Sequence, residues 1–130
     1  MKYMLDTNIC IAVIRQTSQR VVENLVSCAP GDVAISTITV AELTHGAHKS
    51  NRPKQNLEAL EQFLLPLEVV DFDQRASVAY GVLRATLEGQ GNLIGGMDML
   101  IGAHALSLGL ILVTNNTREF ERISKLEIQD

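Results

Sequence analysis

Short apolar runs alternate with amphipathic stretches along the whole sequence, and this alternation limits the possible fold more than any other feature. Five runs have the length and aliphatic content of buried strands: Tyr3–Leu5, Val33–Ser36, Leu67–Val70, Leu110–Thr114 and Leu126–Ile128. Between them, apolar residues recur every three or four positions, as in helices that pack on one side. Strands that alternate with helices form parallel sheets with right-handed crossovers. The sequence therefore predicts one α/β domain over residues 1–130, with a parallel sheet of about five strands and helices on both faces.

Local signals predict where several of the helices begin or end. Thr39 and Glu42 match a capping box, so we expect a helix to begin at Thr39 and to carry Glu42 in its first turn. Asp73 is placed to cap the long helix after the third strand, and Gly109 to end the helix before the fourth. Pro30 is expected to end the second helix.

Composition narrows the class of protein without deciding its activity. Apolar residues make up 46% of the 130 positions and charged residues 20%, which is typical of a globular domain. We find neither an apolar run of ~20 residues nor a signal-peptide core, so we expect a cytoplasmic protein with no membrane span. The net charge of −4 is not typical of a general nucleic-acid binder, but an acidic balance is also found where carboxylates are concentrated to hold a metal. Cys10 and Cys28 lack metal-type spacing and are interpreted as reduced core thiols.

Four acids stand at strand-to-helix junctions or near helix starts, and they are the candidate catalytic residues: Asp6, Glu42, Asp98 and Glu119. Loops that follow parallel strands gather at one edge of the sheet, and Asp98 joins the others if its helix begins at that edge. Clustered carboxylates repel one another and require a counter-ion, for which oxygen ligands favour Mg²⁺ or Mn²⁺. Such an ion activates water for attack on a phosphodiester. Thr114 and Asn116, at the end of the fourth strand, are candidates for positioning the phosphate.

Each candidate also has a structural explanation, and the pattern alone leaves both open. Asp6 is placed to cap the first helix, Glu42 completes the capping box, and Asp98 and Glu119 suit helix N-termini through the helix dipole. His104 lies on the apolar stripe of its helix and is interpreted as a hydrogen-bonded core residue.

Basic residues form one local cluster, Lys49, Arg52 and Lys54, in or beside a loop predicted over residues 48–53. The cluster is interpreted either as a solvated surface or as a rim that contacts phosphates beside the acidic site, where binding would be salt-sensitive. The sequence does not separate these two possibilities.

Four segments, in order along nearly the whole chain, carry a resemblance to a known family: Met4–Cys10, Ile35–Leu43, Ile94–Asp98 and Ile111–Phe120. They resemble the signature blocks of the PIN-domain family, and most of all the VapC toxins of bacterial toxin–antitoxin pairs. The resemblance implies a sheet of order 3-2-1-4-5 and a Mg²⁺- or Mn²⁺-dependent endoribonuclease. It also implies a VapB antitoxin that covers the acidic site, and a homodimer.

By position, the resemblance assigns a role to each acid. It makes Asp6 and Asp98 the principal metal ligands, Glu42 a third acid and Glu119 the fourth acidic position, with Asn116 as a polar neighbour. Asn116 stands where many relatives carry Asp, which bears on whether a second metal binds. The residues around Asp6 and Glu119 are similar to those of the VapC branch that cleaves initiator tRNA in its anticodon loop.

Two other classes share some of these features. A phospho-accepting receiver module has the same size and doubly wound fold, but it needs a Lys after a late strand, and Thr114–Asn116 supplies none. A catalytically silent PIN-fold binding protein, whose acids only cap helices, is the remaining alternative. Cleavage of RNA with and without divalent metal separates these classes.

Overall fold

The computed structural model describes residues 1–29 and 31–130. In chain order, its elements are β1 (Tyr3–Leu5), α1 (Thr7–Arg15), α2 (Gln19–Val26), β2 (Val33–Ser36), α3 (Thr37–Lys49), α4 (Pro53–Leu64), β3 (Glu68–Val70), α5 (Gln74–Gly89), α6 (Gly96–Leu108), β4 (Ile111–Val113), α7 (Thr117–Phe120) and β5 (Ile128–Gln129). The predicted alternation of strands and helices is confirmed.

The five strands form one parallel sheet of order β3-β2-β1-β4-β5, which confirms the order that the family resemblance implies. β1 is central, and Tyr3 lies opposite both Val33 of β2 and Ile111 of β4. The carboxyl ends of β1, β2 and β4 therefore lie side by side, and the segments that follow them meet at one edge of the sheet.

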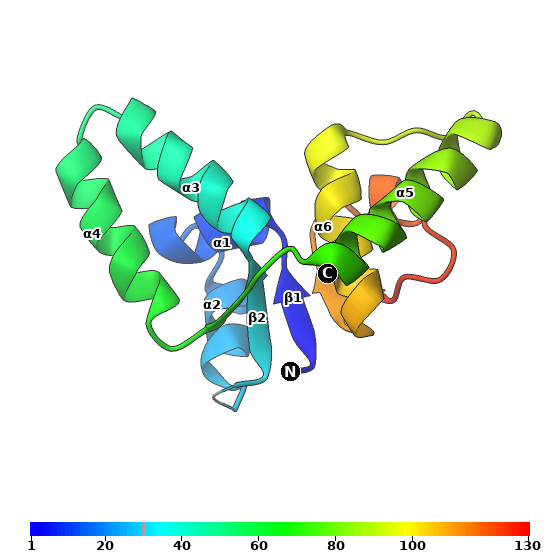
Figure 1. The fold of residues 1–130 in the computed structure, drawn as a ribbon. Helices are drawn as coiled ribbons and strands as arrows, with labels where there is room; N and C mark the ends of the chain where they lie inside the picture. Colours follow the sequence, from blue (N-terminus) through cyan, green and yellow to red (C-terminus); the bar gives the residue numbers. More distant parts are fainter. Residues whose placement is uncertain (30) are drawn as a thin grey trace.

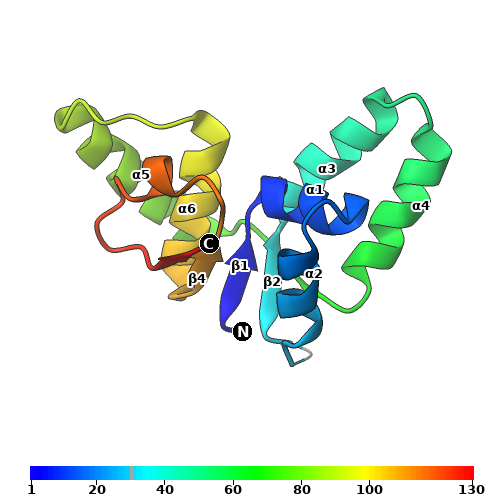
Figure 2. The same cartoon turned by 180° about the vertical axis from the view of Figure 1, so that it is seen from behind.

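Alternate residues of the strands supply two separate hydrophobic cores. Met4, Ala34 and Leu112 pack with buried residues of α5 and α6, such as Leu83 and Ile101. Figures 1 and 2 show α5 and α6 on one side of the sheet and α1 to α4 on the other. The neighbouring positions Leu5, Val33 and Ile35 pack on the second side, with residues of α1, α3 and α4. Helices cover both faces, as predicted, and each strand is buried from two sides.

The helix that carries Glu42 begins earlier than predicted. Ser36, the last residue of β2, is the N-cap of α3, and its Oγ accepts a hydrogen bond from the Ile38 N–H at 3.1 Å. Thr39 is buried inside the helix, so the capping box predicted from Thr39 and Glu42 is wrong. Because β2 passes directly into α3, Glu42 lies in the second turn of the helix and not in the first.

Other boundaries follow the predicted signals more closely. Asp73 caps α5 by accepting the Ala76 N–H at 3.0 Å, and Gly109 ends α6 in the left-handed conformation at φ 66°. The predicted end of the second helix at Pro30 lies outside the described residues; α2 ends at Val26. In the described part of the chain, no helix is long and apolar enough to span a membrane.

Two predicted loop or helix segments differ from the structure near the site. Residues 48 and 49 belong to α3 and Pro53 begins α4, so the predicted loop over residues 48–53 is shorter than expected. The helix predicted over residues 118–123 is regular only over Thr117–Phe120. Close packing explains its position, because a Cβ on Gly102 of α6 would lie 2.8 Å from Cδ1 of Ile123. A glycine at this position therefore lets α6 approach the segment that follows β4.

Candidate active site

Asp6 lies at the end of β1, where it is both the cap of α1 and a member of the acidic cluster. Its side chain is 3% exposed. Oδ1 accepts the Ile9 N–H at 2.9 Å, and Oδ2 accepts the Thr114 hydroxyl at 2.5 Å. Burial raises the pKa of Asp6, and the charge of Glu42 raises it further, while these two hydrogen bonds lower it. Asp6 therefore caps α1 and also belongs to the acidic cluster, two roles that the sequence alone leaves as alternatives.

Asn116 connects Asp6 to the two later acids through the end of β4. Its backbone N–H donates to Oγ1 of Thr114 at 2.9 Å, and the Thr114 hydroxyl in turn donates to Asp6. Its side-chain Nδ2 donates to Oε2 of Glu119 at 3.0 Å and to Oδ2 of Asp98 at 3.4 Å. A continuous chain of hydrogen bonds therefore joins three of the four predicted acids and both predicted supporting residues.

Asp98 stands in the first turn of α6, which begins at the acidic edge as the prediction required. Burial raises the pKa of Asp98 to about 7, together with a hydrogen bond to Glu119 and repulsion from Glu119, Asp6 and Glu42. The pKa of Glu119 is lowered, because Asp98 and Asn116 both stabilise its ionised form by hydrogen bonding. Asp98 therefore keeps its proton to a higher pH than Glu119 does.

Glu42 approaches the cluster from α3. Its Oε1 accepts the Thr7 hydroxyl at 2.6 Å, and that hydroxyl lies 3.4 Å from Oγ1 of Thr39. Glu42 raises the pKa of both Asp6 and Asp98 by charge repulsion, so it faces the same space. Among the described residues, however, no hydrogen bond joins it to the other acids. No local pattern singles out Thr7, whose role in orienting Glu42 becomes visible only in three dimensions.

The donor set suits a hard divalent cation held partly through water. Within residues 1–29 and 31–130, no three Asp, Glu, His or Cys side chains are close enough together to enclose a metal by themselves. Mg²⁺ usually keeps several waters and uses only one or two carboxylates of the protein. Burial raises the pKa of Asp6 and of Asp98, and repulsion from neighbouring carboxylates raises both further, so a cation at this edge would offset both effects. Four carboxylates with hydroxyl and amide neighbours therefore fit Mg²⁺ or Mn²⁺ with bridging waters.

His104 and the two cysteines lie outside the acidic cluster. Nδ1 of His104 is 2.8 Å from Oγ of Ser36, its ring meets Phe72 edge-on, and burial lowers its pKa. It is a hydrogen-bonded core residue, as predicted. Both cysteines are free, as predicted. Cys10 is buried in the second core, which raises the pKa of its thiol, and Cys28 is half-buried and packs against the same core.

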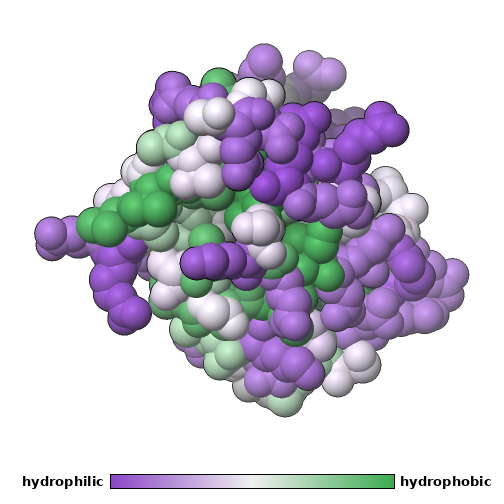
Figure 3. Space-filling model, turned by 90° about the vertical axis from the view of Figure 1, so that its right-hand side faces the viewer, coloured by the Kyte–Doolittle hydropathy of each residue, from purple (hydrophilic) through white to green (hydrophobic). Residues whose placement is uncertain are grey.

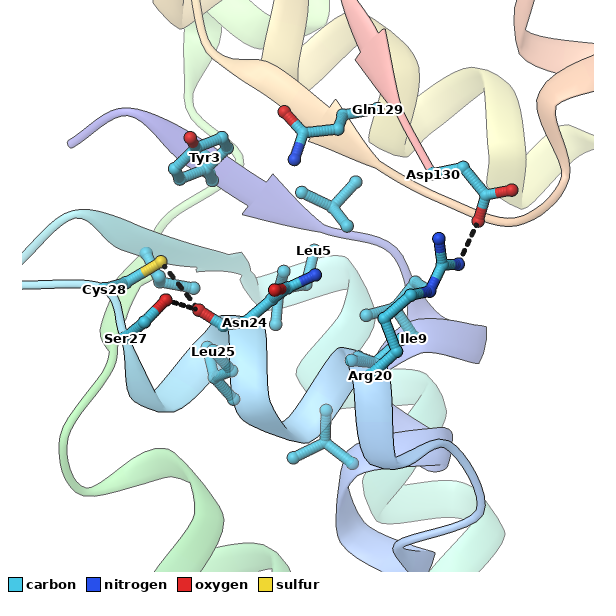
Figure 4. Close-up of a pocket in the computed structure, with 14 residues that line it drawn as sticks. Tyr3, Leu5, Ile9, Arg20, Asn24, Leu25, Ser27, Cys28, Gln129 and Asp130 are labelled. Atoms are coloured by element: carbon cyan, nitrogen blue, oxygen red, sulfur yellow. Dashed lines mark hydrogen bonds and ion pairs between the residues drawn. The ribbon is translucent and has the colours of Figure 1, made fainter.

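A cavity of about 240 Å³ opens elsewhere, between α2 and the strands β1, β4 and β5 (Figure 4). None of the four acids lines it. Ser27 and Cys28 donate to the Asn24 carbonyl, and Arg20 pairs with Asp130 at 3.2 Å. The sheet edge, where Thr114 and Asn116 join three of the four acids, remains the candidate active site.

Residues 3–126 match the model of the PIN-domain family. Over 130 residues, the chain is 45% identical to the tRNA(fMet)-specific endonuclease VapC of Shigella flexneri, covering all of this chain and 98% of that protein. It is also 45% identical to the ribonuclease VapC2 of Haemophilus influenzae over the same share of both chains.

Solved structures agree with this likeness. The DNA-bound VapBC complex of Salmonella typhimurium contains a chain that superposes with a TM-score of 0.95 at 43% identity, covering all of this chain and 98% of that one. VapBC2 of Rickettsia felis, bound to a fragment of promoter DNA, gives a TM-score of 0.93 at 42% identity over 99% of this chain and 98% of that one. The similarity therefore extends over the whole fold, including the edge that carries the acids.

Proposed function

The chain belongs to the PIN-domain family and, within it, to the VapC proteins, and we propose that it is a toxin that hydrolyses RNA phosphodiester bonds with the help of Mg²⁺ or Mn²⁺. The observation that carries this proposal is the hydrogen-bonded chain from Asp6 through Thr114 and Asn116 to Asp98 and Glu119. It gathers carboxylates at the edge where parallel sheets hold ligands, and three of them would repel without a cation.

In this proposal Asp6 and Asp98 would hold the metal, with Glu42 as a third acid. The bound ion would activate a water and neutralise charge that develops on the phosphate. Thr114 fixes one oxygen of Asp6, and Asn116 fixes Asp98 against Glu119. Glu119, whose pKa is lowered, is ionised at neutral pH and accepts the proton of the attacking water. The water oxygen would then bond to phosphorus while the bond from phosphorus to the ribose oxygen breaks. The leaving ribose oxygen takes a proton from solvent, and Glu119 returns its proton to solvent.

The proposed substrate is tRNA, and initiator tRNA in particular, in the cytoplasm. The support is the 45% identity to a protein of Shigella flexneri whose name gives that specificity. The residues around Asp6 and Glu119, which resemble those of the initiator-tRNA branch, support the same substrate.

We further propose that a VapB-type antitoxin inhibits the chain by covering the acidic edge. A groove of about 160 Å³ between α1, α3 and α4 leads to Glu42 and is lined by Ile11, Ile14, Leu43 and Leu60. Apolar grooves of this kind accept an amphipathic segment of a partner. The complexes of Salmonella typhimurium and Rickettsia felis support this partner, because each contains a VapBC pair.

A homodimer is the proposed state of the toxin itself, within a larger toxin–antitoxin assembly. Figure 3 faces the side of the molecule that carries α5 and α6 and shows apolar surface among polar groups. On α5, Val78 and Val82 are 62% and 65% exposed. Exposed apolar residues one turn apart are a suitable contact for a second copy, and light scattering of the free toxin tests this.

Cleavage of total tRNA by the purified chain, freed of antitoxin, tests the proposed activity. The reaction would be run in Mg²⁺ and in EDTA, with Asp6→Ala and Asp98→Asn variants and with Glu121→Gln as a control at an exposed acid near the site. We expect metal-dependent cleavage that both site variants abolish and the control retains. Cleavage that survives chelation would contradict the metal-carboxylate mechanism. Metal binding without cleavage would favour the silent binding protein.

A further inference from the structure

One segment of this acidic chain carries only positive charge. The sequence has 15 Asp and Glu residues and a net charge of −4, yet residues 43–57 contain no acid. The same segment carries Lys49, Arg52 and Lys54, together with His45 and His48. We call residues 45–54 the basic segment. It includes the second half of α3 and the turn into α4.

The basic segment begins directly beside the acidic edge. Figure 1 shows α3 leaving the end of β2 and meeting α4 at a turn well away from the sheet. Lys49 follows Glu42 by seven residues, which is two helical turns or about 10 Å along the same face of α3. His45 lies between them, one turn beyond Glu42. A line of hydrogen-bond donors therefore leads from Glu42 outward along one helix.

The cations of the basic segment are available to a ligand. Lys49, Arg52 and Lys54 are all exposed. In the part of the chain that the structure describes, neither of the two ion pairs involves them. Several other cations are engaged: Arg20 with Asp130, Arg84 with Glu88, Arg122 with the Leu93 carbonyl and Lys2 with the Tyr3 ring.

A polyanion that approaches this site meets a net negative protein and four carboxylates. Binding of RNA therefore requires local positive charge, since phosphate neutralisation by Lys and Arg supplies most of the non-specific affinity. We infer that the basic segment binds RNA phosphates on one side of the scissile bond, with Lys49, Arg52 and Lys54 as the contacts. This inference rests on the proposed function and adds the surface along which the substrate lies.

Charge reversal tests the inference with a matched control. One variant combines Lys49→Glu, Arg52→Glu and Lys54→Glu. The control combines Lys2→Glu, Arg75→Glu and Lys125→Glu, which are also exposed and produce the same change in net charge. Lys2 and Lys125 precede β1 and β5, so they lie toward the opposite edge of the sheet. Both sets are made in an Asp98→Asn background, and the anisotropy of labelled tRNA is followed from 50 to 300 mM KCl.

We expect the basic-segment variant to bind tRNA roughly 10- to 100-fold more weakly than the control near 0.15 M salt. The slope of log K against log salt should fall by about 2, or roughly 0.7 for each lost contact with single-stranded RNA. With Asp98 restored, KM for cleavage should rise in proportion while kcat changes little. A variant with Gln at the three positions provides the same comparison if charge reversal prevents folding.

Equal affinities and equal salt slopes for the two charge-reversal variants would overturn the inference. So would a loss of affinity for the antitoxin with unchanged tRNA binding, because the segment would then be a protein-docking surface. In both cases metal-dependent cleavage by the wild-type chain leaves the proposed function intact. A wild-type chain that neither binds nor cleaves tRNA would remove the proposed function and this inference with it.

Discussion

The acidic site has two sides that are built in different ways. On one side, Asp98 and Glu119 shift each other's pKa in opposite directions, and the Asn116 amide donates to both carboxylates. On the other, Glu42 accepts a single hydrogen bond from Thr7 at 2.6 Å. The first side brings together two carboxyl groups that a proton or a metal must partly neutralise, whereas the second holds one acid through a single hydroxyl. Asp6 lies between them and is tied to the first side through Thr114. We therefore expect the first side to dominate metal binding.

The largest effect is expected from removing the charge of Asp98. Asp98→Asn should reduce cleavage of tRNA about a thousandfold, since stabilisation by the metal amounts to several kcal/mol. Glu42→Gln should reduce it only about 10- to 100-fold, as for a ligand that acts through water. Initial rates at saturating Mg²⁺ provide the comparison. Equal losses in the two variants would show that the two sides contribute alike.

Substitution of the residues that support each side should reduce activity in the same order, but by smaller factors. Asn116→Ala removes the amide between Asp98 and Glu119, and we expect a loss of about 10- to 100-fold in metal affinity or rate. Thr7→Val keeps the shape of the side chain but removes the hydroxyl that holds Glu42, and a loss of less than about tenfold should follow. Titration with Mn²⁺ measures the metal affinity of both variants. A larger loss of affinity in Thr7→Val than in Asn116→Ala would contradict the expected order of the two sides.

His104 joins α6, which carries Asp98, to the N-cap of α3, which carries Glu42. It follows Asp98 by six residues on α6, and its partner Ser36 precedes Glu42 by six residues. His104→Leu leaves the Ser36 hydroxyl without this partner and should lower the free energy of unfolding by about 1–3 kcal/mol. His104→Asn places an amide near the position of Nδ1, so it should lose less. Urea unfolding of the two variants measures the difference, and equal stabilities would show that the hydrogen bond contributes nothing.

The smallest expected effect is on stability as the pH changes. Asp6 and Asp98 have raised pKa values in the folded chain, so their protonated forms favour folding. That contribution is fully present below the unfolded pKa near 4 and is lost as the pH rises through about 7. In EDTA, Tm should therefore fall between pH 5 and pH 8, and Mg²⁺ should reduce the fall. A Tm that rises over this range in EDTA would contradict the assignment.

Much of the fold and of the acidic site was predictable from the sequence. The strand order follows from the family resemblance. The meeting of Asp6 and Glu119 follows from where parallel strands end, whereas Asp98 joins them because α6 begins at that edge. The start of α3 was not predicted, because Ser36 serves both as the end of β2 and as a helix cap. Thr7 and His104 were missed as connectors because their partners are 35 and 68 residues away. Contacts over such separations depend on how the helices pack, which local patterns do not specify.

Calorimetric titration of Mg²⁺ into the free toxin at pH 6.5 tests most directly whether the acidic edge is a metal site. The titration would be repeated in two buffers of different ionisation enthalpy, which yields the number of protons released on binding. Since Asp98 holds a proton near neutral pH, the wild-type chain should bind Mg²⁺ and release protons. Asp98→Asn should bind more weakly and release fewer. Absence of binding by the wild-type chain, or binding with identical affinity and proton release in both proteins, would contradict the account.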